Sequence, residues 1–261
     1  MSGDGGGLYR EPLLYDVVNT PGTAAEVDAL IRCARRFARG GGGPGSTWLE
    51  PACGTGRYLR ALAGRGRRVR GYDPLPDMVA FARERLDRRS ADHRVLPASF
   101  TTPAPDLAGL GPADVAFCPV NSLRHLMTDD DVLAHFAQVA ALLAPGGVYV
   151  VGLDLLAPDA APDEDVWTAT RGGLTVQQVI QYLPPEAGDR VEHVIVSMTA
   201  DRPRGRRQHD HAYGLRTYTA GQWSALVERS ALRPVATCDA GGRPYASAAP
   251  LPYQLEVLAA R

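Results

Sequence analysis

One short segment, residues 48–57 (WLEPACGTGR), constrains the fold of this chain more than any other. An apolar stretch typical of a strand leads into a turn that holds Gly54 and Gly56, and a helical pattern begins at Arg57. Glycine accepts a positive φ and has no Cβ, so the turn can be tight and a ligand can approach its backbone. The helix that follows offers unpaired N–H groups at its start. The segment therefore predicts a strand–turn–helix unit, either as an ordinary tight turn or as a binding site.

Two nucleotide-binding fingerprints fail at this turn. A dinucleotide site of the form GxGxxG needs a third glycine where Leu59 stands, and the chain has no Gly-Lys-Ser/Thr of a phosphate loop. The ligand must therefore be sought from other matches along the chain.

Strand-like and helix-like segments alternate up to about residue 155. Strands are expected at residues 47–50, 68–72, 93–96, 114–118 and 148–153, and helices at 57–64, 76–89 and 128–144. An earlier helix is expected to start at a capping box, Thr23–Glu26. This alternation implies a mostly parallel sheet with helices on both faces.

The pattern changes after residue 155. Segments 175–183, 191–200 and 208–218 are extended and separated by polar breaks, which predicts an antiparallel meander. A capping box at Thr219–Gln222 opens a further helix, and strands are expected at 232–238 and 253–259. We expect a single α/β domain, with a cap region at 1–45, a binding core at 46–155, a β-rich lid at 156–218, and residues 219–261 completing a seven-stranded sheet.

Composition excludes several classes of protein. Of the 261 residues 45% are hydrophobic and 22% charged, as in ordinary globular chains, and the net charge of −1 argues against a general binder of nucleic acid or acidic membranes. The four cysteines lie far apart, which is neither a zinc framework nor a disulfide scaffold. No apolar run reaches about 18 residues and no signal peptide is evident, so we expect a cytoplasmic protein. Every basic residue is arginine, which suggests a GC-rich bacterial genome.

Four motifs together resemble the class I S-adenosylmethionine (SAM) methyltransferases of small-molecule type. Glu50-Pro-Ala-Cys-Gly-Thr-Gly56 matches the family's first motif, acidic-x-x-C/G-G-x-G. The segments 72–78, 96–100 and 114–126 follow at suitable spacing, and 142–147 matches a structural turn. The resemblance covers residues 45–155 well and is similar to that of amino-sugar and glycine N-methyltransferases. It implies a Rossmann-like class I methyltransferase fold with an inserted antiparallel β lid, and SAM as cofactor.

The resemblance also implies a set of donor-binding residues. Asp73 would accept hydrogen bonds from both ribose hydroxyls, because a carboxylate offers two acceptors to a vicinal diol. Ser99 stands where the family usually has an acidic residue, and Phe100 would pack the adenine. Each has an alternative, since Asp73 also suits a turn and Phe100 also suits the core. The expected donor-binding residues are Tyr15, Glu50, Cys53, Gly54, Gly56, Asp73, Pro74, Ser99, Phe100 and Asn121.

His125 is the candidate general base. It follows Asn121 on the loop that should face the methyl group, and histidine is the side chain whose pKa is most easily set near neutrality. The alternative is a histidine that only begins a helix. This loop reads Cys118-Pro-Val-Asn121 and lacks the Asn/Asp-Pro-Pro-Tyr/Phe of amino methyltransferases acting on DNA or protein glutamine, which argues against those substrates.

Three residues are candidates for binding the acceptor: Tyr9, His211 and Arg216. His209 and His211 share one face of a predicted strand, but no third ligand completes a metal site, so no metal is predicted. The alternatives are ordinary packing for Tyr9, a solvated strand for His211 and a surface salt bridge for Arg216. The arginines between 60 and 70 are interpreted as a solvated edge, so no nucleic-acid partner is expected.

These observations predict SAM-dependent methylation of a small molecule on nitrogen or oxygen, in bacterial specialised metabolism, and leave a homodimer open. Two other hypotheses remain. One is a SAM-binding protein of the same fold with other chemistry, such as cyclisation. The other is a non-catalytic partner subunit that has kept the fold.

Overall fold

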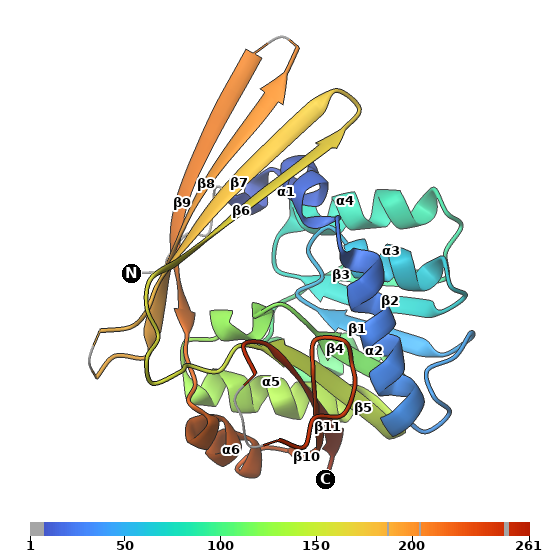
Figure 1. Cartoon of the computed structure of the whole chain (residues 1–261). Helices are drawn as coiled ribbons and strands as arrows, with labels where there is room; N and C mark the ends of the chain where they lie inside the picture. Colours follow the sequence, from blue (N-terminus) through green and yellow to red (C-terminus); the bar gives the residue numbers. More distant parts are fainter. Residues whose placement is uncertain (1–7, 187, 204, 248–250) are drawn as a thin grey trace.

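The computed structural model describes residues 8–186, 188–203, 205–247 and 251–261, and its strands form two sheets. The larger sheet has seven strands in the order β10-β11-β5-β4-β1-β2-β3, and the smaller has four in the order β6-β7-β8-β9. Figure 1 shows the smaller sheet rising from one side of the larger one. The predicted seven-stranded sheet with an inserted antiparallel lid is confirmed.

The larger sheet comes from alternating elements along the first half of the chain. Its strands are β1 (Thr47–Pro51), β2 (Arg68–Asp73), β3 (His93–Pro97), β4 (Ala113–Cys118) and β5 (Leu143–Leu153), all parallel, followed by the antiparallel β11 (Gln254–Ala260) and β10 (Leu232–Cys238). The helices are α2 (Thr23–Phe37), α3 (Arg57–Ala63), α4 (Pro76–Asp87), α5 (Asp129–Leu142) and α6 (Ala220–Glu228).

Each face of this sheet has its own core, because side chains alternate between the faces along every strand. On one face Trp48, Val115 and Val150 pack with residues of α2, α3 and α4. On the other face Leu49 and Tyr149 pack with α5 and α6. The sheet is thus covered on both sides, and its carboxyl edge is left for a site.

The lid consists of β6 (Asp163–Arg171), β7 (Leu174–Leu183), β8 (Val191–Arg202) and β9 (Gly205–Arg216), joined as an antiparallel meander. Its inner face packs against α1 (Pro12–Asn19), with Leu14, Val17, Val176 and Val196 in one apolar cluster. The sequence analysis missed β6, because its exposed, acidic start resembles a loop. It also left residues 12–19 without a helix.

Two expected helix ends differ from the structure. The first capping box is wrong: Gly22 is the N-cap of α2, and the Thr23 hydroxyl instead accepts a hydrogen bond from Arg57 at 2.8 Å. Helix α5 stops at Leu142 rather than at the following Pro-Gly-Gly, and β5 starts at once. The capping box at Thr219 is confirmed, with both reciprocal hydrogen bonds present.

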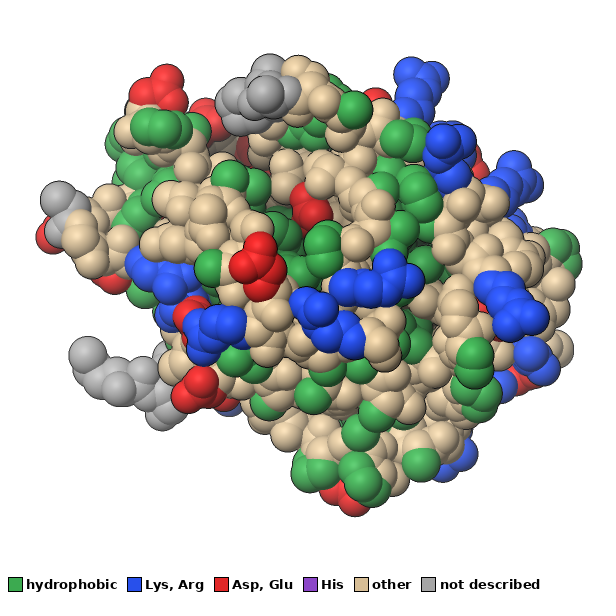
Figure 2. Space-filling view, turned by 90° about the horizontal axis from the view of Figure 1, so that it is seen from below, with side chains coloured by type: hydrophobic (Ala, Val, Ile, Leu, Met, Phe, Trp, Pro, Cys, Tyr) green, Lys and Arg blue, Asp and Glu red, His purple; other side chains and the backbone are tan. Residues whose placement is uncertain are grey.

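The end of the molecule near α6, β10 and β11 shows basic and acidic side chains interspersed with apolar ones (Figure 2). No helix in the described ranges is long and apolar enough to cross a membrane.

Candidate functional site

The turn after β1 has the strained geometry that its glycines permit. Gly54 has φ 51° and Gly56, the N-cap of α3, has φ 69°. A Cβ on Gly56 would lie 3.1 Å from the Cβ of Ala82 on α4, so this position also lets α3 approach α4 closely. Ala52 shares the left-handed conformation, with φ 52°. The backbone is therefore bent around an open concavity at the carboxyl edge of the sheet.

Asp73, at the end of β2, is tied to this turn. Its Oδ2 accepts a hydrogen bond from the Gly54 N–H at 2.8 Å, and its Oδ1 accepts one from the Leu75 N–H at 3.0 Å. Burial raises the pKa of Asp73, and these two backbone donors oppose the rise. Each carboxylate oxygen keeps a lone pair for a further donor. The carboxylate is thus held in a geometry that suits a diol.

Two buried oxygens beside the turn have no hydrogen-bond partner among the described residues. They are Glu50 Oε2 and Thr55 Oγ1, and their residues are 3% and 1% exposed. Buried polar atoms are nearly always paired, so such orphans indicate a missing partner. Burial also raises the pKa of Glu50. An amino group of a ligand fits this site, because it would donate hydrogen bonds to these oxygens.

A small cavity of about 60 Å³ lies against these atoms, between the turn, α1 and the loop after β4. A pocket for a nucleoside-sized ligand usually exceeds about 300 Å³. The cavity by itself is therefore smaller than such a ligand. The lining residues are Tyr15, Asn19, Glu50, Ala52, Cys53, Gly54, Thr55, Arg57, Tyr58, Pro119, Val120 and Ser122.

The loop after β4 is strained at two consecutive residues. Val120 has φ 52° and Asn121 has φ 61°, which are unusual for non-glycine residues and most of all for a β-branched one. The Val120 N–H donates to Tyr253 Oη at 3.1 Å, and the Asn121 N–H donates to the Gly152 carbonyl at 3.0 Å. Strain held in this way is typical of functional loops.

Asn121 contacts Asp154 with both polar atoms of its side chain. Its Nδ2 donates to Asp154 Oδ2 at 2.6 Å, and its Oδ1 accepts from the Asp154 N–H at 2.9 Å. The residue expected to bind the donor therefore joins the loop to the end of β5.

His125 forms a cluster with Tyr9 and with Tyr213 of β9, where the loop after β4 meets the lid. Its ring is 5.3 Å from that of Tyr213 and 6.1 Å from that of Tyr9, and Tyr9 Oη is 3.4 Å from His125 Nε2. The surrounding protein and Arg124 lower the pKa of His125 to about 4. His125 is neutral at neutral pH.

Tyr15 lies between this cluster and the glycine turn. Its ring lies 3.9 Å from the position of a Cβ on Gly54 and 5.7 Å from the ring of Tyr9. The structure thus brings together predicted residues from α1, the turn, β2 and the loop after β4. Tyr9, Tyr15, Glu50, Cys53, Gly54, Gly56, Asp73 and His125 form this group.

Other predicted residues have different surroundings. The Ser99 hydroxyl bonds to Thr101 and Thr102, and Phe100 packs edge-to-face on His135 at 4.7 Å. Pro74 is exposed beside Asp73. His211 lies on β9 with its Nε2 buried and unpaired among the described residues.

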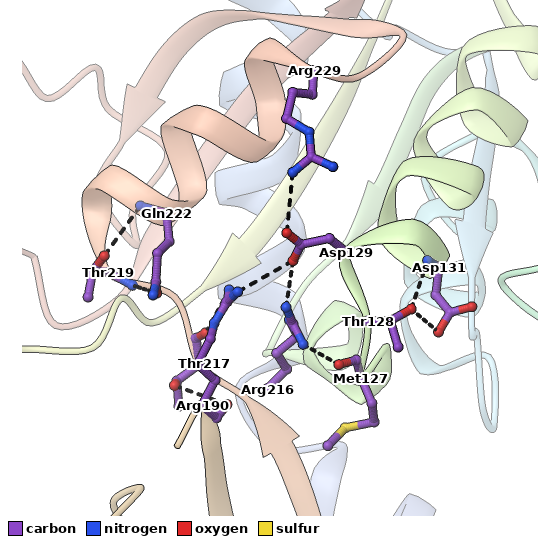
Figure 3. A network of polar contacts seen from close by, with 10 residues as sticks. All are labelled: Met127, Thr128, Asp129, Asp131, Arg190, Arg216, Thr217, Thr219, Gln222 and Arg229. Carbon is purple, nitrogen blue, oxygen red and sulfur yellow. Dashed lines mark hydrogen bonds and ion pairs between the residues drawn. The ribbon is translucent and has the colours of Figure 1, made fainter. Parts of the chain in front are cut away.

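Arg216 belongs to a network at the base of the lid (Figure 3). It donates to Asp129 at 2.5 Å and to the Met127 carbonyl. Arg190 and Arg229 also pair with Asp129, at 3.5 and 3.4 Å. Figure 3 shows these three arginines, from the lid and α6, pointing at the first residue of α5. Arg216 therefore anchors the lid to the helix that follows His125.

Sequence reasoning missed Asn19, Arg57, Ser122 and Asp154. Arg57 directly follows the glycine turn, where its guanidinium stacks on Tyr58 at 4.0 Å and pairs with Glu26 at 2.7 Å. The sequence signal that could have identified Arg57 is its position directly after Gly56. Within the described ranges, no group of three or more His, Cys, Asp or Glu side chains could hold a metal ion.

A cavity of about 890 Å³ lies elsewhere, between α6, β10 and β11. The donor-site residues are not in its lining, so we place the chemistry at the smaller cavity. The smaller cavity is lined by the glycine turn and by buried oxygens that have no partner among the described residues, and both features suit a ligand.

Comparison with known proteins agrees with this placement. Residues 49–147 match the family model described as a methyltransferase domain. Over this range the chain carries a methyltransferase domain. The matched range begins in β1 and ends in β5, so it includes the glycine turn, Asp73 and the strained loop.

Two curated relatives extend the comparison. The dTDP-3-amino-3,6-dideoxy-alpha-D-glucopyranose N,N-dimethyltransferase of Streptomyces fradiae is 28% identical over 80% of this chain and 76% of its own length. The malonyl-[acyl-carrier protein] O-methyltransferase of Serratia marcescens is 32% identical, but the match spans only 44% of this chain and 40% of the relative.

Solved structures show the same fold over nearly the whole of this chain. DesVI of Streptomyces venezuelae aligns with a TM-score of 0.75 at 21% identity, covering 95% of this chain and 96% of its own. CalS10, an amino pentose methyltransferase from Micromonospora echinaspora, aligns with a TM-score of 0.66 at 24% identity, covering 91% and 90%. The lid is therefore part of the shared fold.

Proposed function

We propose that this protein transfers a methyl group from SAM to the amino group of a small molecule, of the nucleotide-linked amino-sugar class, in bacterial specialised metabolism. The observation that carries the proposal is that two half-sites lie on either side of Tyr15. One consists of Glu50, Gly54 and Asp73, and the other is the cluster of His125, Tyr9 and Tyr213. The relative from Streptomyces fradiae supports the acceptor class.

The residues of the first half-site suit each part of the donor. Asp73 would accept hydrogen bonds from the ribose hydroxyls, and the unpaired oxygens of Glu50 and Thr55 would accept them from the amino group. Tyr15, on α1, would cover the bound molecule and exclude water. SAM supplies a methyl group on a positively charged sulfur, so the leaving group needs no activation.

The lowered pKa of His125 favours nitrogen over oxygen as the attacking atom. A free amine attacks with its own lone pair: the N–C bond forms, the C–S bond breaks with its electrons staying on sulfur, and the surplus N–H proton leaves to solvent. A hydroxyl would need a base with a pKa near the working pH. His125 has a lowered pKa, so it is a weak base that can still orient an amine by accepting its N–H.

Calorimetric titration with SAM, its demethylated product and NAD tests the donor half-site. We expect micromolar binding of the first two and none of NAD, with binding lost in Asp73→Ala. Product mass then distinguishes the hypotheses, since methylation adds one CH₂ unit and a cyclisation adds none. A chain that binds no SAM would be a partner subunit instead.

We further propose that the protein forms a homodimer in the cytoplasm through the outer face of the lid. Val166 and Ile195, on that face, are 55% and 40% exposed and would be covered in such a dimer. Light scattering of the wild type and of Ile195→Glu tests this, because a monomer in the wild type contradicts it.

A further inference from the structure

We propose that Asp154 binds the amino group of the acceptor and so selects an amine over a hydroxyl at the reacting position. This assignment rests on the methyl transfer proposed above, and it adds a residue to the acceptor site.

Asp154 stands at the edge where the two half-sites meet. It directly follows β5, and its neighbour in space is the strained Val120–Asn121 turn, whose Val120 lines the donor cavity. Ligands of sheets of this kind bind beyond the carboxyl ends of the parallel strands. An acceptor that reaches the methyl group must pass this edge.

The Asp154 side chain is held rigidly by its contacts with Asn121. The side chain and backbone of Asp154 each make one hydrogen bond with the Asn121 amide, at 2.6 and 2.9 Å. A side chain that is already fixed loses little conformational freedom when it binds a ligand. The contacts engage only Oδ2, and no donor among the described residues reaches Oδ1.

Asp154 is also accessible, with 42% of its side chain exposed. The nearest cation is Arg124, 3.9 Å away, but Arg124 lies closer to Glu192, at 2.7 Å. Arg124 is therefore largely neutralised by Glu192, and Asp154 keeps much of its negative charge available.

The lid adds further acidic character opposite Asp154. Asp165 pairs across the sheet with Ile180, which is buried on the inner face, so Asp165 and Tyr182 share that face. Burial raises the pKa of Asp154, Asn121 and Arg124 oppose the rise, and the negative charge of Asp165 adds to it. A protonated amine would relieve this repulsion, and a hydroxyl would not.

The geometry therefore suits an ammonium ion that docks on Oδ1 of Asp154. Hydrogen bonds between an ammonium and a carboxylate are roughly twice as strong as those between neutral groups. The proton is released to water before the amine attacks. Asp154 thus raises the local concentration of the amine and points its nitrogen along the edge toward Val120.

The experiment compares four forms of the full chain: wild type, Asp154→Asn, the exchanged pair Asp154→Asn with Asn121→Asp, and Asp159→Asn as a control. The exchanged pair can rebuild both hydrogen bonds but moves the carboxylate to position 121. Asp159 is exposed on the same segment between β5 and β6. Asp159→Asn therefore removes a negative charge without changing the hydrogen bonds between Asp154 and Asn121. The probes are a dTDP-linked 3-amino sugar and dTDP-glucose, with KM, kcat and calorimetric SAM affinity as readouts.

We expect Asp154→Asn and the exchanged pair to raise KM for the amino sugar about ten-fold or more. The exchanged pair should keep the SAM affinity of the wild type, and Asp159→Asn should leave both KM and SAM affinity unchanged. Recovery of KM in the exchanged pair would show that Asp154 is only a clamp and would overturn the assignment. An unchanged KM in Asp154→Asn would do the same while leaving the proposed function intact. A wild type that binds SAM but methylates only the hydroxyl sugar would overturn both.

Discussion

Asp16 and Arg171 form an ion pair of 2.7 Å that joins the helix over the donor cavity to the end of β6 in the lid. Asp16 is fully buried, and it also pairs with Arg60 of α3 at 2.9 Å and Arg85 of α4 at 3.5 Å. One carboxylate therefore connects α1, the lid and the main sheet's helices. Because Tyr15 precedes it, this carboxylate also fixes the residue that covers the cavity.

Asp16→Asn should destabilise the protein by about 3 kcal/mol, because it leaves three arginines around a neutral side chain. These arginines lower the pKa of Asp16, so its contribution is present above the ordinary carboxyl pKa and is lost as the pH falls below it. Urea unfolding at pH 7 measures the change.

Asp28→Asn is the matched control, since Asp28 pairs with Arg65 at 3.0 Å but is 52% exposed. Its removal should alter stability by less than about 1 kcal/mol. Equal effects of the two substitutions would show that the buried carboxylate is not a connecting point.

Gly56→Ala should weaken both folding and SAM binding. An alanine at φ 69° is strained by about 1–2 kcal/mol, and its Cβ would press on Ala82 at 3.1 Å. Gly64, the C-cap of the same helix, has φ −61° and only ordinary contacts, so Gly64→Ala should be close to neutral. Thermal unfolding and SAM calorimetry of both variants test the difference, and equal midpoints would contradict it.

Local signals in the sequence predicted the parts of this structure that depend on local chemistry. The turn at Gly54 and Gly56 and the capping box at Thr219 are each determined within a few residues, and both are confirmed. The capping box at Thr23 failed because Arg57, distant in sequence, takes the threonine hydroxyl. A local pattern is overruled where a tertiary contact supplies a stronger partner.

The acceptor side depends on contacts that no local pattern contains. Asn121 matched its motif position, but its amide contacts Asp154, 33 positions further along the chain. The sequence allows Arg216 either to bind the acceptor or to form a salt bridge, and in the structure its guanidinium pairs with Asp129. Charged residues on a loop or strand end cannot be assigned to a ligand until their partners are known.

Stability should fall in mild acid because of His135. This histidine is fully buried, with Nε2 2.8 Å from Tyr149 Oη and Nδ1 3.2 Å from Gln138 Oε1, and burial lowers its pKa to about 4. Between about pH 6.5 and 4 the unfolded chain binds a proton at this residue and the folded chain does not, so stability decreases as the pH falls.

The loss reaches up to about 3 kcal/mol at the acid end of that range. Unfolding free energies measured by urea from pH 7 to 4 should show it, and the NMR signal of His135 should not titrate near 6.5. A normal titration of that signal would contradict the prediction.

The pH dependence of turnover should come from the acceptor and not from His125. The lowered pKa of His125 keeps its ring neutral from about pH 6 upward, so no inflection near 6.5 is expected from this residue. An amine must be unprotonated to attack, so kcat/KM should rise with pH until it levels off at the amine's own pKa. His125→Asn should lower kcat through lost orientation while leaving the position of this inflection unchanged. Turnover that instead follows a wild-type inflection near 6.5, and loses it in His125→Asn, would make His125 a general base and favour a hydroxyl acceptor.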